Sequence, residues 1–266
     1  MSNYNPIVTH DIDRYYKWRQ FKSIFGEFGR IARGLSTWTY SEAWRSFQNR
    51  KSADPFSNLE RIAEMDANAG LQSVFYIMTT EEADPLNIND YHIKDQDINK
   101  SLKKLISMGA EIGIHPGIKT FDNKKKMQRQ KDMLEDAIEK EVVRSRQHYL
   151  KYEYPTTFHN LESIGIKNDS SILIDLKDEP DKEKRTTYIM KNVDGSPMQI
   201  TQTPLVFMDT HHMQSEDEEI LSLLEKSLTI AKEEGGEVMV LWHNNNISNS
   251  REEGLYKEAL QIIKGR

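Results

Sequence analysis

Short apolar runs of β type alternate with segments of helical spacing along most of the chain. The runs predict strands at Ile7–Asp13, Ser73–Met78, Glu111–His115, Val142–His148, Ser171–Leu176, Pro204–Asp209 and Glu237–His243. Helical spacing predicts helices at Arg14–Ile31, Asn58–Ala69, Asp95–Met108, Lys124–Lys140, Phe158–Ile164, Glu218–Glu234 and Glu252–Lys264. This alternation is typical of an α/β fold with a mainly parallel sheet, either open or rolled into a barrel.

The positions of glycines and polar segments along the chain predict a single domain over residues 1–266. Gly109, Gly165 and the pair Gly235–Gly236 stand where helices should end before the next strand. The polar segment Leu176–Thr187 is too short to separate two domains and is interpreted as an exposed loop. The aromatic residues between Tyr15 and Phe28 are interpreted as the core side of the first helix.

Composition excludes several classes of protein. The 266 residues include no cysteine, which rules out a thiol nucleophile, an iron–sulfur cluster and a disulfide framework. The formal charge of -6 argues against a nucleic-acid partner, which would need a basic stripe. We find no signal-peptide pattern at the start and no run of about 20 apolar residues that could span a membrane. We therefore expect a cytoplasmic protein, of an oligomeric state that the sequence does not indicate.

Titratable residues stand at the ends of four predicted strands. They are Asp11 and Asp13 on the first, His115 on the third, Arg146 and His148 on the fourth and His243 on the last. In parallel barrels and open α/β sheets, ligands bind at the carboxyl ends of the strands, where the loops converge. The shared position of these residues predicts a functional site at that edge of the sheet.

Each of these residues also has a simpler interpretation. Asp11 and Asp13 point the same way on an extended strand, and like charges are costly to bury without a cation or a shared proton. Asp13 could instead cap the helix predicted from Arg14. His115 and His148 could be hydrogen-bonded residues at the rim, Arg146 could pair with any acid, and His243 could transfer protons. Their joint occurrence at strand ends is what favours a site.

A rival cluster lies in Met208–Met213, which offers Asp209, His211 and His212. Adjacent histidines on a strand point to opposite faces, so at most one of them would join Asp209. The sequence has no glycine-rich phosphate loop, no nucleophile elbow and no dinucleotide fingerprint.

In their order along the chain, these motifs resemble those of the polysaccharide deacetylases, the NodB-homology or carbohydrate esterase family 4 proteins. Asp11–Asp13 is similar to that family's first motif, Glu111–His115 to its second, Arg146 to its third and His243 to its last. The resemblance implies a distorted (β/α) barrel of about seven parallel strands. It also implies a divalent metal, usually zinc, and removal of N- or O-linked acetyl groups from sugars.

The resemblance further implies roles for these residues. Asp11 would be the catalytic base, oriented by Arg146, and His243 would protonate the leaving group. Asp13 and His115 would bind the metal, and either Asp169 or Asp209 would be the aspartate that orients the arginine and the base.

The chain departs from the family at Lys119, which stands where a second histidine is usual and cannot coordinate while charged. The candidates for a third ligand are His148, His10 and one of His211 and His212. His10 should point away from Asp11 and Asp13 on the strand, whereas His148 shares a face with Arg146. We therefore predict His148 as the third ligand.

The expected function is a metal-dependent deacetylase acting on an acetylated sugar or polysaccharide precursor. The segments SRQHYLKY, GIKNDSS and TPLVFMD are similar to a branch of deacetylase-like proteins associated with bacterial surface-polysaccharide biosynthesis. One alternative is a catalytically inactive carbohydrate-binding protein on the same fold. Another is a metal-free hydrolase of non-peptide C–N bonds.

Overall fold

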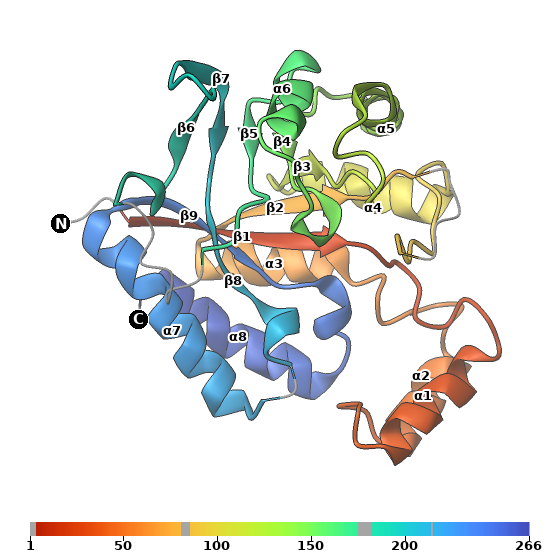
Figure 1. The fold of residues 1–266 in the computed structure, drawn as a ribbon. Coiled ribbons are helices and arrows are strands. Elements are labelled where there is room, and N and C mark those ends of the chain that lie inside the picture. The colour runs from red at the N-terminus through yellow and green to blue at the C-terminus, as the bar shows by residue number, and fades with distance from the viewer. Residues whose placement is uncertain (1–3, 81–85, 175–181, 214, 266) are drawn as a thin grey trace.

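The computed structural model of the chain describes residues 4–80, 86–174, 182–213 and 215–265. Its described strands form one curled, mostly parallel sheet in the order β6-β7-β5-β4-β3-β2-β1-β9-β8 (Figure 1). The strands are β1 Tyr4–Ile12, β2 Gln72–Ile77, β3 Glu111–Ile114, β4 Arg144–Ser145, β5 Asn168–Asp169, β6 Tyr188–Lys191, β7 Pro197–Gln202, β8 Leu205–Met208 and β9 Gly236–Leu241. The predicted α/β fold with a distorted barrel is confirmed, although nine strands form the sheet and β6 pairs with β7 in the antiparallel direction.

The helices cover one side of this sheet. They are α1 Ser23–Ala32, α2 Tyr40–Gln48, α3 Leu59–Ala69, α4 Gln96–Ser107, α5 Lys124–Ile138, α6 Thr156–Ser163, α7 Asp217–Glu234 and α8 Ser250–Lys264. Neighbours pack in the order α6, α5, α4, α3, α8, α7, which follows the order of the strands they cover. Helices α1 and α2 stand apart from this layer, as a hairpin that projects from the body (Figure 1).

The two-residue period of the strands divides the side chains between two environments. On β1, Val8 and Ile12 join the main core against the helices, whereas Ile7 belongs to a smaller cluster on the inner face of the curled sheet. Because successive side chains alternate, Thr9 and Asp11 share the inner face with Ile7. The same alternation places Tyr76 of β2 on the inner face. The register of the central strands therefore decides which polar residues reach the inside.

The sheet closes partly on itself because β7 and β8 follow one another almost without a break. β7 pairs with β5, and β8 pairs with β9 on the other side. A bridge between Leu173 and Leu205 joins the segment after β5 to β8. This bridge replaces the strand predicted at Ser171–Leu176, of which residues 175 and 176 lie outside the described part of the chain.

The helix predicted at Arg14–Ile31 begins only at Ser23. The preceding backbone is held by distant carboxylates instead of helical hydrogen bonds. Asp90 accepts the N–H groups of Tyr15 and Tyr16, and Asp54 accepts those of Lys17 and Trp18. These long-range bonds explain the error, and they also exclude Asp13 as the cap of a helix starting at Arg14.

The strand predicted at Val142–His148 is also shorter than expected. Only Arg144–Ser145 is strand, and His148 begins a 3₁₀ turn, His148–Leu150, in which Tyr149 and Leu150 have positive φ angles of 57° and 53°. The shared strand face assumed for Arg146 and His148 is therefore wrong, since the chain turns between them.

Helix α2 and strands β5, β6 and β7 were not predicted, although α2 and the β6–β7 hairpin each have a sequence signal. α2 begins with a capping box in which the Thr39 hydroxyl and the Glu42 carboxylate bond each other's backbone N–H groups. The β6–β7 hairpin turns at Asp194–Gly195, where Gly195 has a φ of 86°.

We predict that Gly113→Ala destabilises the fold. A Cβ at this position of β3 would lie 2.5 Å from the Tyr76 ring and 3.2 Å from the carbonyl oxygen of Arg144. Such overpacking costs about 1–3 kcal/mol, whereas Gly254→Ala in α8 meets nothing within 4 Å and should stabilise by about 0.5–1 kcal/mol. Urea unfolding of both variants tests this, and an unchanged midpoint for Gly113→Ala would contradict it.

Candidate metal centre

The carboxyl ends of the central strands enclose a pocket of about 570 Å³. Its lining includes every predicted site residue except Arg146, which lies buried behind Asp11. The lining residues used below are Asp11, Asp13, His115, His148, Tyr149, His211 and His243. The residues predicted at the strand ends therefore lie together at one edge of the sheet.

Three potential metal ligands converge in this pocket. The Nε2 atom of His115 lies 3.3 Å from Oδ1 of Asp13, and that of His148 lies 3.6 Å from the same oxygen. Among the described residues, Asp13, His115 and His148 form a group whose donor atoms all lie within 4.8 Å of one another. Asp13 follows β1 directly, His115 follows β3, and His148 opens the turn after β4.

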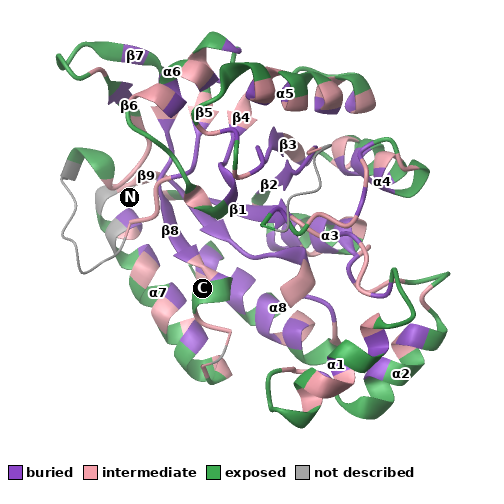
Figure 2. Ribbon diagram, turned by 45° about the vertical axis from the view of Figure 1, so that its right-hand side comes forward, coloured by how far each residue is buried: buried purple, intermediate pink, exposed green. Residues whose placement is uncertain are grey.

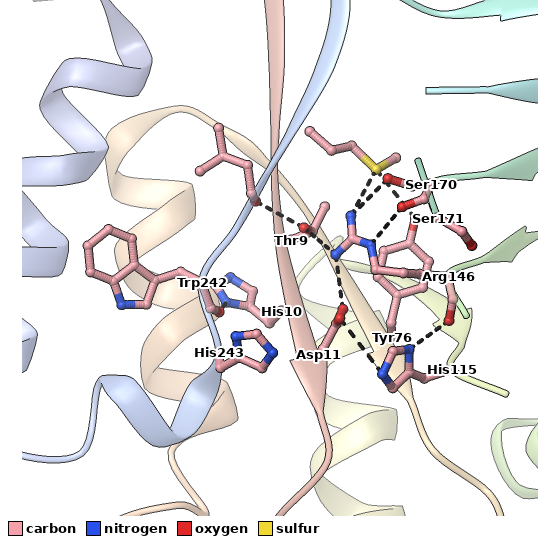
Figure 3. A network of polar contacts seen from close by, with 12 residues as sticks. Thr9, His10, Asp11, Tyr76, His115, Arg146, Ser170, Ser171, Trp242 and His243 are labelled. Atoms are coloured by element: carbon pink, nitrogen blue, oxygen red, sulfur yellow. Dashed lines mark hydrogen bonds and ion pairs between the residues drawn. The ribbon is translucent and has the colours of Figure 1, made fainter. Parts of the chain in front are cut away.

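The hydrogen bonds of these side chains leave two acceptor atoms, Nε2 of His115 and Oδ1 of Asp13, directed toward each other. The Nδ1–H of His115 donates to the carbonyl oxygen of Arg146 at 2.6 Å, which turns the other ring nitrogen toward Asp11 (Figure 3). The same nitrogen also faces Asp13. Oδ1 of Asp13 is buried with no hydrogen-bond partner among the described residues. Lone pairs that converge on one point repel unless a proton or a cation lies between them.

The pKa shifts of these side chains indicate their protonation states before any metal binds. Burial by itself would raise the pKa of Asp13, but His115, with His148 and His243, lowers it to about 2. Burial would lower the pKa of His115, but the charges of Asp11 and Asp13 raise it. For His148, burial together with the nearby His115 lowers the pKa to about 4. Near neutral pH, Asp13 is therefore an anion and His148 a neutral imidazole, the forms in which both coordinate metals.

The arrangement fits a divalent metal such as zinc. Tetrahedral zinc with bonds of ~2.0–2.1 Å holds its ligand atoms about 3.3 Å apart, close to the spacing of the His115–Asp13 pair. One carboxylate with two histidines is a common ligand set for catalytic zinc, which keeps a further position open. The Nδ1–H bond of His115 to a backbone carbonyl is the usual support of such a ligand.

A fully buried arginine holds the second aspartate. Nη1 of Arg146 donates to Oδ1 of Asp11 at 2.9 Å and to the Thr9 hydroxyl at 2.8 Å. Nε and Nη2 donate to the carbonyl and hydroxyl oxygens of Ser170, and the guanidinium lies 4.5 Å from the centre of the Tyr76 ring. Oδ2 of Asp11 remains directed toward Nε2 of His115, at 3.8 Å (Figure 3).

On the other side of the pocket, Asp209 holds His243. The carboxylate accepts Nδ1–H of the ring at 2.6 Å and the backbone N–H at 2.9 Å, and Asn246 donates to it at 2.7 Å. Burial would lower the pKa of His243, but Asp209, with smaller effects of Asp11 and Asp13, raises it to about 9. The imidazole is therefore protonated near neutral pH.

The structure also separates the candidates that the sequence left open. His10 points to the helix side, as predicted, where its ring nitrogens contact the carbonyl oxygen of Trp242 at 2.7 Å and Asp66 at 3.1 Å. His211 lines the pocket but does not join the group of three. Asp169 bonds Ser171 and Asp209 bonds His243. In the described part of the chain neither aspartate hydrogen-bonds Arg146, so the structure does not bear out either one as the residue that orients the arginine and the base. Lys119 is exposed.

Comparison with known proteins places the fold. No family model and no curated protein matches the sequence. Among solved structures, a protein from Mycobacterium smegmatis assigned as a polysaccharide deacetylase aligns with a TM-score of 0.60 at 13% identity, covering 99% of this chain and 85% of that one. The PuuE allantoinase aligns with a TM-score of 0.57 at 12% identity, covering 98% and 85%. A mutant of BA3943, a carbohydrate esterase family 4 pseudoenzyme with restored activity, aligns with a TM-score of 0.52 at 10% identity, covering 98% and 63%.

These likenesses confirm the resemblance seen in the motifs at the level of the fold. The chain has the curled, mostly parallel α/β sheet of the polysaccharide deacetylases. At 10–13% identity, the comparisons establish a shared fold but do not establish the activity of this chain. The role of each site residue has to be argued from this chain's own geometry.

We predict that zinc binding depends on Asp13, His115 and His148. Asp13→Asn, His115→Ala and His148→Ala should each weaken zinc binding by at least about tenfold, since even changes around a ligand cost 10- to 100-fold. Asp11→Asn and His211→Ala should retain most of the affinity, and His159→Ala, an exposed histidine outside the pocket, is the matched control. Calorimetric titration with zinc measures the affinities. Unchanged binding in His148→Ala, or its loss in His211→Ala, would show that the ligand set is misassigned.

Proposed function

We propose that the protein is a metal-dependent deacetylase that hydrolyses an N- or O-linked acetyl group of a sugar or polysaccharide precursor. The observation that carries the proposal is the placement of an Asp13–His115–His148 donor set in one pocket with two further groups suited to proton transfer, Asp11 and His243. This is the arrangement that hydrolysis of an acyl group needs, because one group takes a proton from water and another gives one to the leaving group.

Asp13, His115 and His148 would hold the metal. When bound there, a divalent cation would polarise the acetyl carbonyl and make a water easier to deprotonate. Asp11 is the general base, because Oδ2 faces the donor set while Arg146 holds Oδ1. Arg146 acts as a positioning residue that fixes this orientation and balances the charge of the carboxylate.

His243 is the general acid in this proposal. Its Nδ1–H is engaged by Asp209, so the proton on Nε2 is the one available to the pocket. The raised pKa of about 9 keeps this proton on the ring until a leaving amine or alkoxide takes it. Asp209 supports the step by stabilising the imidazolium.

The pocket offers a surface for a sugar ring. Tyr149 lines it with 58% of its surface exposed, its ring centre 4.3 Å from that of His148. An aromatic face beside polar groups suits a ring that has an apolar face and hydroxyl groups at its edge. We therefore place the acetylated sugar against Tyr149, with its acetyl group toward His115.

The direct test measures acetate released from acetylated sugars by the zinc-loaded protein. A panel of N-acetylated and O-acetylated oligosaccharides separates amide from ester substrates. Asp11→Asn should lower turnover by at least about 100-fold, within the usual range for loss of a general base, while its zinc content is retained. Asp132→Asn, at an exposed aspartate of α5, is the control and should leave turnover unchanged. Equal turnover in Asp11→Asn would overturn the assignment of the base.

A non-catalytic carbohydrate-binding protein is the alternative function. It has support in this chain's departure at Lys119 and in the fold likeness to a pseudoenzyme. Binding of the same oligosaccharides without acetate release, by protein with near-stoichiometric zinc, would favour this alternative. Release of ammonia or amine from a non-sugar amide without metal would favour the C–N hydrolase instead.

We predict an alkaline limit on turnover near pH 9. The pKa of His243 is raised, so the proton needed by the leaving group is present below about pH 9 and is lost above it. Asp209→Asn removes the carboxylate charge that raises the pKa of His243, while burial, which lowers this pKa, remains. The alkaline fall in turnover should therefore move to lower pH by more than about one unit. A kcat profile over pH 5–10 measures it. An alkaline limb that stays in place in Asp209→Asn would contradict the role of His243.

A further inference from the structure

The α1–α2 arm, residues 14–51, is a small folded unit on the body. Its inner side has its own core of Trp18, Ile24, Trp38, Ala43 and Phe47, separate from the core of the sheet. It is attached to the body near α8 by hydrogen bonds from Trp38 to Ser248 and from Asn249 to Thr37. Tyr15 joins the main core instead, and Phe28 and Ile31 pack against the arm's own core, so the inward positions of the arm are filled.

The outer side of the arm carries aromatic rings that face solvent. Phe21 is 62% exposed, Phe25 63% and Trp44 45%. Ring contacts make these residues one patch, because Phe21 lies 5.9 Å from Phe25 and 5.3 Å from Phe47, and Phe47 lies 6.0 Å from Trp44. Both helices show exposed surface over much of their length in Figure 2. The sequence interpretation of this segment as helix core is therefore wrong for Phe21 and Phe25.

The arm also has the opposite charge to the rest of the protein. Residues 14–51 contain nine arginine or lysine residues and two glutamates, a formal charge of +7 in a chain of -6. Both acids are already engaged, Glu27 by Lys17 and Arg30, and Glu42 by the hydroxyl and N–H of Thr39. Exposed basic residues, among them Arg19, Lys22 and Arg45, lie close in sequence to the aromatic rings.

We propose that the α1–α2 arm binds the surface of an anionic phospholipid bilayer. Aromatic rings between basic side chains suit the interface, where rings enter the headgroup region and cations attract anionic lipids. A neutral protein partner would not need the charge, and a second copy of this chain would bring two patches of like charge together. Charge complementarity therefore favours an anionic membrane. Across the described residues, no helix is long and apolar enough to cross the membrane, so contact would be peripheral.

The position of the arm gives this contact a direction. It begins at Arg14, which lines the pocket and directly follows Asp13. In Figure 1 the arm continues from the end of the β1 arrow. A bilayer held by the arm would therefore lie at the end of the sheet where the pocket is. Binding itself requires no activity, so the proposal can be tested apart from the deacetylase function.

Trp44 provides a specific reporter, because the other three tryptophans, Trp18, Trp38 and Trp242, are at most 7% exposed. The experiment adds phosphatidylcholine vesicles with about 30% phosphatidylglycerol to the full-length protein, and pure phosphatidylcholine vesicles as the comparison. We expect co-sedimentation and a blue shift of tryptophan emission with the anionic vesicles only, and quenching by brominated acyl chains. In Trp44→Phe the quenching should disappear while co-sedimentation persists.

Two pairs of variants separate the contributions of charge and rings. Lys22→Gln with Arg45→Gln should weaken binding by about 25-fold, since each basic residue near an anionic surface contributes roughly fivefold. Phe21→Ser with Phe25→Ser should weaken it by at least about tenfold. The matched controls, Lys125→Gln with Lys226→Gln and Ile189→Ser with Val193→Ser, change exposed residues elsewhere and should bind like the parent protein. Thermal unfolding checks that each variant is folded.

Absence of binding to the anionic vesicles would overturn the proposal. So would equal loss of binding in the control pairs. Loss in Lys125→Gln with Lys226→Gln would indicate a general charge effect, and loss in Ile189→Ser with Val193→Ser would indicate a general effect of exposed apolar surface. Sedimentation velocity without lipid tests whether a second copy of the chain binds the patch. If the protein does not bind vesicles but self-associates, and Phe21→Ser with Phe25→Ser abolishes the self-association, the patch is a dimer interface.

Discussion

The buried guanidinium of Arg146 is the constraint on which the site depends. An arginine stays charged in a protein, and a fully buried charge is tolerated only when it is paired and its N–H groups are bonded. Asp11 supplies the opposite charge, and Thr9 and Ser170 take other donors. Breaking such a pair by removing one partner typically costs about 3–5 kcal/mol. The ion pair therefore fixes the side chain of Asp11 on the inner face of β1.

The same residue organises the proposed metal ligands through its backbone. The carbonyl oxygen of Arg146 accepts the Nδ1–H of His115, so the other ring nitrogen must face Asp13. The chain then turns, which brings His148 to the same oxygen of Asp13. Beneath the guanidinium, the ring of Tyr76 lies against Gly113, where no side chain could fit. One residue thus orients the proposed base and one proposed ligand, and its loop delivers a second.

The sequence predicted which strand-end residues would come together better than it predicted the elements that carry them. Strand-end residues follow from local pattern, so Asp11, His115 and His243 were found directly. The two-residue period correctly excluded His10. His148 was chosen on a strand face that does not exist, and it reaches the site through a turn with positive φ angles that no apolar pattern encodes. Asp169 and Asp209 could not be told apart from the sequence, because each stands at the carboxyl end of a short strand, and their different partners, Ser171 and His243, depend on the tertiary structure.

The arm shows where pattern reasoning fails for a physical reason. Helical spacing continues backward from α1, but Asp54 and Asp90 bond the backbone of residues 15–18 from far along the chain. Exposure of Phe21 and Phe25 could not be inferred either, since aromatic residues are usually buried when a core is available. The capping box of α2 was the local signal that could have revealed the second helix of the arm.

The central claim is that the two histidines and Asp13 hold a metal in the pocket. It is tested most directly by diffraction from zinc-soaked crystals, with data collected on both sides of the zinc absorption edge. The account predicts an anomalous peak at ~2.0–2.2 Å from Oδ1 of Asp13 and from Nε2 of His115 and His148. A peak held by other residues, or no peak in crystals whose pocket is open to solvent, would contradict it.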